Sequence, residues 1–427
     1  MQSKSGKTIL FIILFLLFKP AISFSLSLEE AISLSRKNLP SYKASKISVE
    51  SKKALYDASL SPYLPSLDAS GTKEHLNTTS EGYDINGYNL SLSYTLFDGG
   101  KRKSDRNIAR LNLYSSREEF RKNLINLEYD AKVMYFTVVA RKEILEQREL
   151  QIKDAQKDYE IANGKHQYGA ALRSDVLQAS VRLKQSLFDS RLSEGEFAKA
   201  LFDLNSFLGR PLGTAYDLEE FLDTDIKLPE KDSLARFALE TPVSIQAENF
   251  VEISKNNLSL SKSNFYPTFY FDLSYADTET CKEYGDKSTE NKSAAVIANW
   301  NIFKWDKFYQ KKSSRRDMEV SRENLKDVKR RLILEVHKAY EDLLTAQENL
   351  KLANQQLEEA RFNYDQALGE YKEGKGDILS LVRAENLLAD SRTRMSISRL
   401  DFAVSKAALE QAAGIETLQT IKKVSIP

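Results

Sequence analysis

Hydrophobic residues follow a period of two in two separate stretches of this chain. In residues 88–97 nearly every second side chain is apolar and Asn, Ser or Thr stand between them, and residues 269–275 alternate in the same way. Such alternation is typical of a strand with one apolar and one polar face. Further strands are expected at 296–302 and, more weakly, at 66–76, so we predict one hairpin in each half of the chain, closed by polar loops at 77–87 and 277–293. The apolar positions that define these strands are Tyr88, Leu90, Leu92, Tyr94, Phe269, Phe271, Tyr275 and Trp300.

Helical periodicity replaces the period of two on both sides of each hairpin. No Gly or Pro interrupts the chain from Lys101 to about Asn163, or from Lys307 to about Leu368. At 1.5 Å per residue, some 60 residues make a helix of ~90 Å. In the second stretch apolar residues follow a 4-3 spacing from Ala339 to Tyr371, which is the seam of a coiled coil.

Shorter helices are expected before each hairpin and after each long helix. Residues 28–60 and 233–264 are helical in pattern, and each is interrupted early by a proline. The long helices end at the glycine-containing turns 164–169 and 369–376, and a return helix follows each turn. The predicted fold is therefore mainly α with a small β part.

The second half of the chain repeats the first at a separation of about 205 residues, pairing Gly169 with Gly374 and Gly209 with Gly414. Solenoid units run ~20–50 residues, so this period indicates one duplicated structural unit. The expected parts are a signal peptide at 1–25, a first repeat at 26–212 with its hairpin at 66–97, a linker at 213–232, and a second repeat at 233–427 with its hairpin at 267–303.

The N-terminus has the layout of a secretory signal. Lys4 and Lys7 precede an apolar run from Thr8 to Phe18, and small residues follow it. The run is shorter than the ~20 residues of a membrane-spanning helix, so we expect cleavage near residues 23–25. An uncleaved membrane anchor is the alternative. Cys281 is the single cysteine, which excludes an intramolecular disulfide.

Composition excludes several classes of function. The 62 Lys and Arg nearly cancel the 61 Asp and Glu, so no global basic field indicates nucleic-acid binding. The three histidines are scattered without Cys or carboxylate partners at ligand spacing, and we expect no metal site and no cofactor. No nucleophile motif, phosphate-binding glycine loop or compact carboxylate pair is found, so we expect no catalysis.

Four predicted strands raise a problem that one chain cannot solve alone. An open four-stranded sheet leaves two bare edges, while single-chain membrane barrels start at eight strands. We therefore expect the chain to supply part of an oligomeric barrel, with its apolar side chains facing outer-membrane lipid and its Ser, Asn and Thr facing water. Two, three or four copies would close such a barrel. An exported coiled-coil scaffold or adhesin without a pore is the alternative.

Several short motifs, in this order and duplicated, resemble the TolC-like outer-membrane efflux protein family over essentially the whole mature chain. They include Leu28 to Ala31 with Pro40, Leu96 to Gly100, and Leu208 to Leu212. The resemblance implies a trimer whose twelve strands form one barrel and whose helices form a tunnel through the periplasm. It also implies docking to a periplasmic adaptor and an inner-membrane pump of RND or ABC type. Efflux and type I protein secretion are not separated by the sequence.

The resemblance also implies roles for the two turns that end the long helices. Family members contact the adaptor at these turns, which here hold Gly169, Ala170, Gly374 and Lys375. Family members close the tunnel with acidic residues six and sometimes nine positions after each glycine. Those positions are Asp175 and Gln178 in the first half, and Ser380 and Arg383 in the second, with Asp377 displaced. This departs from a ring of paired carboxylates, although Arg173 and Arg383 could form salt links with Asp175 and Asp377. The competing interpretation of Asp175 is a helix cap.

Overall fold

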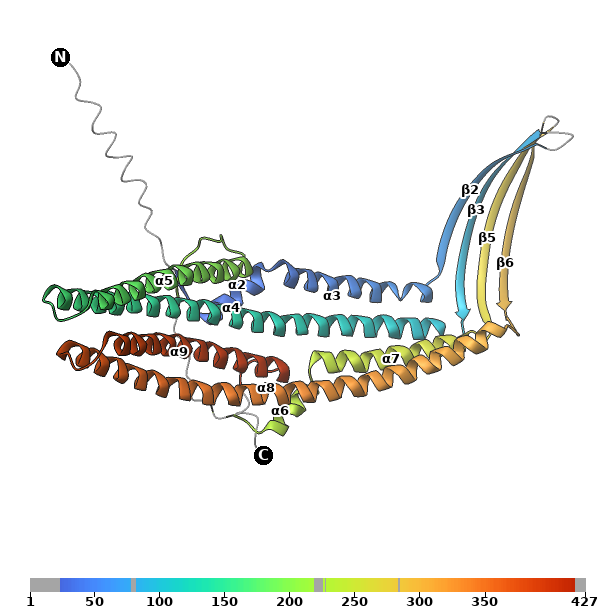
Figure 1. Ribbon diagram of the computed structural model, residues 1–427. Helices are drawn as coiled ribbons and strands as arrows, with labels where there is room; N and C mark the ends of the chain where they lie inside the picture. The colour runs from blue at the N-terminus through green and yellow to red at the C-terminus, as the bar shows by residue number, and fades with distance from the viewer. Residues whose placement is uncertain (1–23, 78–81, 219–225, 227, 283–284, 419–427) are drawn as a thin grey trace, which may run out of the picture. The chain divides into compact units, whose positions relative to one another are not determined.

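The computed structural model describes residues 24–77, 82–218, 226, 228–282 and 285–418. The chain divides into two compact units, whose main helices and strands are labelled in Figure 1. The first, called the helical unit, consists of residues 1–43, 124–235 and 335–427. The second, called the sheet unit, consists of residues 44–123 and 236–334. Residues 1–23 of the expected signal peptide lie outside the described ranges.

The two halves of the chain have the same order of elements: two helices, two strands, a long helix and a return helix. In the first half these are α2 (Leu28–Asn38), α3 (Pro40–Ala58), β2 (Ser66–Asn77), β3 (Gly82–Phe97), α4 (Lys101–Gln167) and α5 (Arg173–Leu208). In the second half they are α6 (Lys231–Ala238), α7 (Pro242–Ser263), β5 (Thr268–Lys282), β6 (Lys287–Asn299), α8 (Trp305–Glu373) and α9 (Ile378–Ala413). A short 3-10 turn (Ser61–Tyr63) precedes β2, and β1 (Phe24–Leu26) pairs in parallel with β4 (Tyr216–Leu218). The predicted duplication and the mainly helical fold are confirmed.

The sheet unit holds one antiparallel sheet in the order β2-β3-β5-β6, drawn side by side in Figure 1. Its strands are longer than the alternation predicts. Residues 82–87 and most of 277–293, expected as polar loops, belong to β3, β5 and β6. The reason is that a ladder is held by backbone hydrogen bonds, which polar side chains do not prevent. Cys281, expected in a loop, lies near the end of β5.

The register of the sheet gathers the apolar residues of both hairpins on one face. Leu92 lies opposite Leu67 on one side and Leu273 on the other, and Leu90 lies opposite Tyr275. Directly paired residues of neighbouring strands point to the same face. The other face is polar: Ser66 and Ser93 hydroxyls are 2.9 Å apart, and those of Ser274 and Ser293 are 2.6 Å apart. The predicted two-faced strands are thus present.

Trp300 is an exception. It was predicted to be a strand residue, and this prediction is wrong, because β6 ends at Asn299. The ladder between β5 and β6 ends at the pair Thr268 and Asn299. The next residue before Thr268 is Pro267, which has no N–H to donate and so stops the ladder. Trp300 instead follows β6 and donates its indole N–H to the backbone carbonyl of Phe265 at 3.2 Å.

A single arginine organises the passage from β3 into α4. The guanidinium of Arg102 donates to Asp98 at 2.9 Å, to the carbonyl of Thr95 at 2.7 Å and to the carbonyl of Pro62 at 3.1 Å. It also lies over the ring of Tyr63. These contacts satisfy carbonyls that the end of a strand leaves without ladder partners. The start of the long helix is therefore fixed to the end of the sheet.

The helical unit is packed along the predicted seam of α8. Ala339, Leu343, Ala353, Ala360 and Tyr364 are all buried. Alanine at alternate seam positions lets neighbouring helices approach closely, because its side chain is a single methyl group. One apolar cluster, called the tip cluster, joins four helices: Ala162 of α4, Ala179 of α5, Leu368 of α8 and Leu388 of α9 belong to it. Within the described ranges, no helix combines the length and the hydropathy needed to cross a membrane.

Candidate functional site

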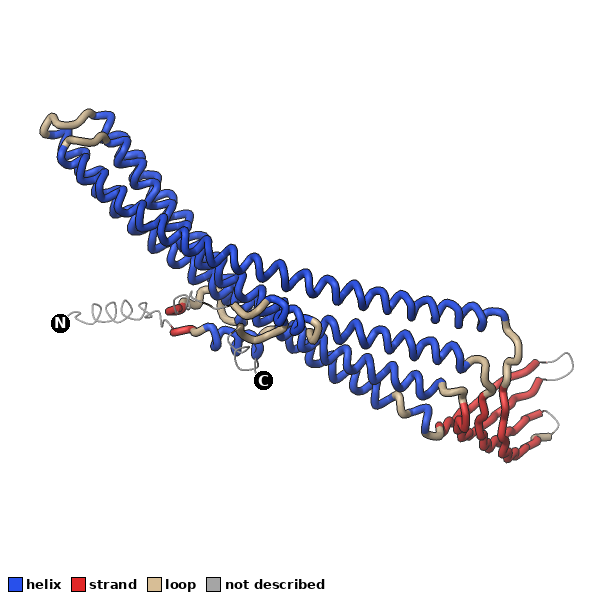
Figure 2. Tube along the Cα trace, turned by 90° about the horizontal axis from the view of Figure 1, so that it is seen from below, coloured by secondary structure: helices blue, strands red, loops and turns tan. Residues whose placement is uncertain are grey.

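The turns between α4 and α5 and between α8 and α9 lie at the same end of the helical unit (Figure 2), and we call this end the tip. Gly169 and Gly374 have φ of +73° and +76°, a left-handed conformation that favours glycine. The next amide in each turn bonds back to the helix. Ala170 N–H donates to the carbonyl of Lys165 at 2.8 Å, and Lys375 N–H donates to that of Glu370 at 2.9 Å. Both turns thus have the same geometry.

The acidic residues predicted at the tip each cap a helix start. Asp377 is the N-cap of α9, and its carboxylate accepts from Ser380 N–H at 2.7 Å. This hydrogen bond holds the pKa of Asp377 below its usual value. Asp175 lies in the first turn of α5, where its carboxylate accepts from Leu172 N–H at 3.3 Å. Carboxylates at helix N-termini are stabilised by the free N–H groups there.

The other predicted tip residues are all exposed. They are Arg173, Gln178, Ser380, Arg383, Ala170 and Lys375. Within the described part of one chain, no ion pair joins Asp175 or Asp377 to Arg173 or Arg383. The charge of Asp175 instead acts on Tyr371 of α8, whose pKa is raised chiefly by burial and also by this carboxylate. Lys165 of α4 lies 4.7 Å from the ring centroid of Tyr371, which links the two turns.

A layer of buried and half-buried charged residues within the helical unit was not found by sequence reasoning. We call it the charged layer. Glu385 of α9 accepts from Arg182 of α5 at 2.9 Å, and Arg392 of α9 donates to Asp154 of α4 at 2.9 Å. In the same layer the Tyr364 hydroxyl of α8 donates to Asp158 of α4 at 3.2 Å. All four helices of the tip cluster therefore contribute to it.

The two most buried acids of the charged layer are incompletely satisfied. Glu385 is 1% exposed and Asp158 is 3% exposed. Glu385 Oε1 and Asp158 Oδ2 have no hydrogen-bond partner in the described structure. Burial, followed by the negative charge of Glu385, raises the pKa of Asp158 to about 7. Burial also raises the pKa of Glu385, although Arg182 opposes this effect.

A signal for this layer is present in the sequence. Along α4 the buried residues Ile144, Gln151, Ala155, Asp158 and Ala162 keep to the 4-3 spacing of a seam, so two polar residues occupy core positions. Along α9, Glu385 and Arg392 continue the same spacing from Ile378 and Leu381. A charged residue on a seam is rare unless it is paired, so these positions indicate buried partners without identifying them.

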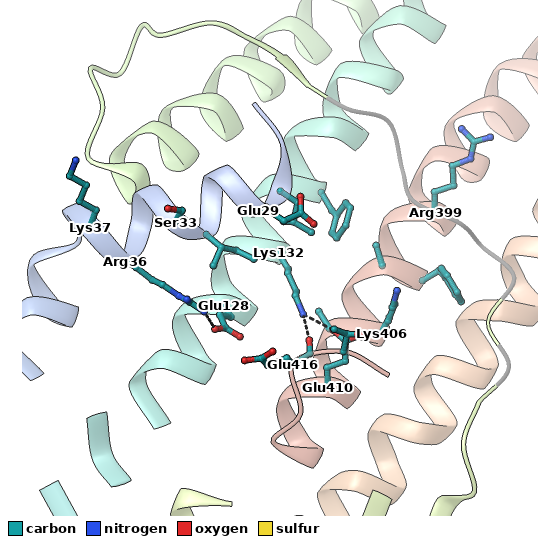
Figure 3. Close-up of a pocket in the computed structure, with 17 residues that line it drawn as sticks. Glu29, Ser33, Arg36, Lys37, Glu128, Lys132, Arg399, Lys406, Glu410 and Glu416 are labelled. Carbon is teal, nitrogen blue, oxygen red and sulfur yellow. Dashed lines mark hydrogen bonds and ion pairs between the residues drawn. The ribbon is translucent and has the colours of Figure 1, made fainter. Parts of the chain in front are cut away.

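The helical unit also contains a pocket of about 1000 Å³ lined by α2, α4, α9 and residues after α9, shown in Figure 3. Its wall carries charges of both signs, and several are paired. Lys132 donates to Glu410 at 2.6 Å, and Arg36 forms an ion pair with Glu128. Glu410 also accepts from Leu418 N–H at 3.1 Å, which holds the segment after α9 against this helix.

One group of possible metal ligands was not anticipated. The ligand atoms of Glu279, Cys281 and Asp286, at the end of the second hairpin, lie within 4.8 Å of one another. The two carboxylates are exposed and Cys281 is half-buried. Exposed acidic groups of this kind are common without an ion, and no further feature of the described residues indicates a ligand here.

Comparison with known proteins gives one family and several solved structures. The model of the family described as "Outer membrane efflux protein" matches residues 31–210 and 246–415. The fold is similar to that of the channel CusC, with a TM-score of 0.80 and 18% identity over 92% of this chain and 94% of that chain.

Two further solved structures share the fold at low identity. The Campylobacter jejuni CmeC outer membrane channel gives a TM-score of 0.79 and 16% identity over 93% of this chain and 88% of that chain. The Neisseria gonorrhoeae MtrE outer membrane channel gives 0.78 and 17% over 91% and 89%. A comparison with curated protein sequences gives no match.

Proposed function

This chain belongs to the outer membrane efflux protein family and is an efflux exit duct of the bacterial outer membrane with its helices in the periplasm, and from that premise we propose how the duct is assembled and closed. Members of this family form trimers and work with adaptor proteins and inner-membrane pumps. We propose a homotrimer of this chain, docked through its tip to a periplasmic adaptor, with an RND or ABC type pump supplying the energy. The chain itself is a passive conduit.

The observation that carries the closed oligomer is the sheet with its two free edges, and the number of three copies follows the family. Among the described strands, β2 and β6 each pair on one side alone. Unpaired edges inside lipid are costly because no water is present to satisfy their N–H and carbonyl groups. Pairing β2 of one copy with β6 of the next removes both edges, and three copies give twelve strands. The apolar face then meets lipid and the face with Ser66 and Ser93 meets water.

The tip supports adaptor docking because its two turns have the same backbone geometry and leave their glycines uncovered. Gly169 and Gly374 have nothing within 4 Å of the position that a Cβ would occupy, so a partner can approach the backbone closely. Ala170 and Lys375 are both exposed at the equivalent place in the two turns. A partner with a helical hairpin of small residues would fit both turns of each protomer, and an acidic residue in it could pair with Lys375.

We place the gate at Asp175. Each protomer of a trimer would present this carboxylate close to the axis, accompanied by Gln178, with Ser380 as its uncharged counterpart. Like charges that converge repel one another unless they are paired or screened. Arg173 and Arg383 form no ion pair with these carboxylates within the described part of one protomer. Both are therefore available to pair with Asp175 or Asp377 across the trimer.

The assembly is tested on the full chain purified in detergent. Native mass spectrometry should give a trimer, and a monomer that retains the full β signal would overturn the proposal.

Topology is tested separately in a Cys281→Ser background. Asn77→Cys at the far end of β2 should react with an impermeant maleimide on intact cells, and Lys375→Cys should react only after the outer membrane is permeabilised. Equal labelling of both would contradict the orientation. A protein that needs no detergent would favour the scaffold alternative.

A further inference from the structure

The charged layer contains more buried acid than base, and this imbalance indicates a bound proton. Its most buried members are Glu385, paired with Arg182, and Asp158, which accepts a hydrogen bond from Tyr364. Asp154 is already paired with Arg392. Three carboxylates therefore face two guanidinium groups. If all were ionised, one negative charge would remain buried without compensation, which is strongly unfavourable in a low-dielectric interior.

The surroundings of Asp158 offer little to neutralise that charge. The titratable and charged groups coupled to the layer are Asp154 and Lys157 from α4, Arg182 from α5, Tyr364 and Tyr371 from α8, and Glu385 and Arg392 from α9. Lys157 is exposed, so water weakens its attraction. A metal ion is not favoured, because among the described residues no group of three acidic, His or Cys ligands gathers here. A proton needs a single oxygen, and Asp158 Oδ2 is buried and free to hold one.

We propose that Asp158 and Glu385 form a proton-operated latch between the helical pair α4/α5 and the helical pair α8/α9. With the proton bound, the layer is neutral and the four helices pack around it. When the proton leaves, an uncompensated carboxylate stays buried beside Tyr364, which belongs to the apolar tip cluster with Leu381 and Leu388. The pairs then separate at this layer to admit water.

The latch differs from the proposed gate in position and in mechanism. Asp175 acts at the turn, between protomers, whereas Asp158 and Glu385 act inside one protomer. Asp158 lies eleven positions before Gly169, and Glu385 lies eleven positions after Gly374. At 1.5 Å per residue the layer is therefore ~16 Å along the helices from the tip. Its effect on conduction rests on the proposed function, whereas proton binding and helix separation do not.

The proton is tested directly by infrared spectroscopy on the full-length protein in detergent. We expect a protonated-carboxyl band at pH 6 that is lost by pH 9, with a midpoint near 7. Asp158→Asn should remove this band. Glu385→Gln should shift the midpoint to lower pH, because it removes the negative charge that favours the proton on Asp158. Asp390→Asn, an exposed neighbour on α9, is the matched control and should change neither.

Helix separation is measured by hydrogen exchange in peptides from α9 around Glu385, corrected for the intrinsic effect of pH on exchange. Wild-type protection should fall about tenfold or more between pH 6 and pH 9, and Asp158→Asn should stay protected throughout. If Asp158→Asn does not fold, the wild-type titration and the shift in Glu385→Gln still decide the matter. Persistence of the pH dependence in Asp158→Asn, or an unmoved midpoint in Glu385→Gln, would overturn the latch. Recovery of protection at pH 9 by added sodium or magnesium ions alone would replace the proton by a cation and also overturn it.

Discussion

Removing Arg182 should expose how strongly the charged layer depends on its ion pair. The side chain of Arg182 is 10% exposed and that of its partner Glu385 is 2% exposed. Truncating one partner of a buried pair leaves the other charge desolvated and costs about 3–5 kcal/mol of stability. Arg182→Met keeps much of the side-chain volume, so this loss is electrostatic rather than the result of a cavity. It is a large fraction of the stability of a typical domain.

The same helix supplies a matched control. Arg191 of α5 forms an ion pair with Glu194, but the two side chains are 83% and 47% exposed. An exposed pair of this spacing contributes about 0.5 kcal/mol or less. Arg191→Met should therefore be nearly silent. Guanidinium unfolding of the detergent-solubilised protein, followed by far-ultraviolet circular dichroism, compares the midpoints of both variants with the wild type.

The sign of the pH effect distinguishes this explanation from simple loss of packing. Without Arg182 the pKa of Glu385, already raised by burial, rises further above its unfolded value. The folded state then holds a proton that the unfolded state releases, so the penalty grows as pH rises and is smaller at pH 5 than at pH 8. Adding Glu385→Gln to Arg182→Met should recover most of the loss. The reasoning is refuted if Arg182→Met costs no more than Arg191→Met, or if neither acid nor Glu385→Gln restores stability.

The other predictions concern the turns, the gate, the protonated acid and the sheet. Gly169→Ala should destabilise the protein by about 1–2 kcal/mol, because the φ of Gly169 is +73°. Gly164→Ala, inside α4, should stabilise the protein by about 0.5–1 kcal/mol. Equal effects of the two variants in thermal unfolding would contradict this difference. Asp175→Ala with Arg383→Ala should raise single-channel conductance in planar bilayers and weaken block by divalent cations, with assembly intact; unchanged values would leave Asp175 as a helix cap. The pKa of Asp158 is raised from 3.8 to about 7, so the folded protein binds a proton that the unfolded chain releases. The free energy of unfolding should therefore fall by up to about 4 kcal/mol between pH 4 and pH 7 and level off above pH 7. A rise in this free energy between pH 4 and pH 7 would exclude the shift. Leu92→Lys on the apolar face should destabilise the membrane-inserted protein by about 2–4 kcal/mol and reduce membrane insertion. Ser93→Lys on the opposite face should insert normally. The reverse result would mean that the two faces are assigned the wrong way round.

The sequence predicted what depends on local pattern. The alternation around Leu92 identified a strand, and the uninterrupted run from Lys101 identified a long helix, because each signal lies within the element that it describes. Strand ends were less predictable. Residues such as Thr278 and Glu279 have no apolar alternation and continue β5 through backbone bonds to β6, which depend on a partner strand rather than on their own side chains.

The charged layer could not be assembled from sequence for a different reason. Asp158 and Glu385 are separated by more than half of the chain, and their helices meet through tertiary packing alone. Each seam position indicates a buried partner, but the pattern of one helix does not show which residue of another helix supplies it. The turn residues Gly169 and Gly374 were recognised because the duplication displays them twice. The layer lacks such repetition, since Asn363 and Ser180 occupy the equivalent positions of Asp158 and Glu385.

The proline that ends the β5–β6 ladder has an evolutionary consequence. Pro267 fixes where β5 starts, and from that point every residue alternates between the two faces of the sheet. Inserting one residue between Pro267 and Phe271 would turn every later ring on β5 to the opposite face. Lineages of such proteins can therefore gain or lose single residues at the distal ends of their hairpins, but close to the proline only changes in pairs would survive selection. Length variation among relatives should accumulate at the distal ends.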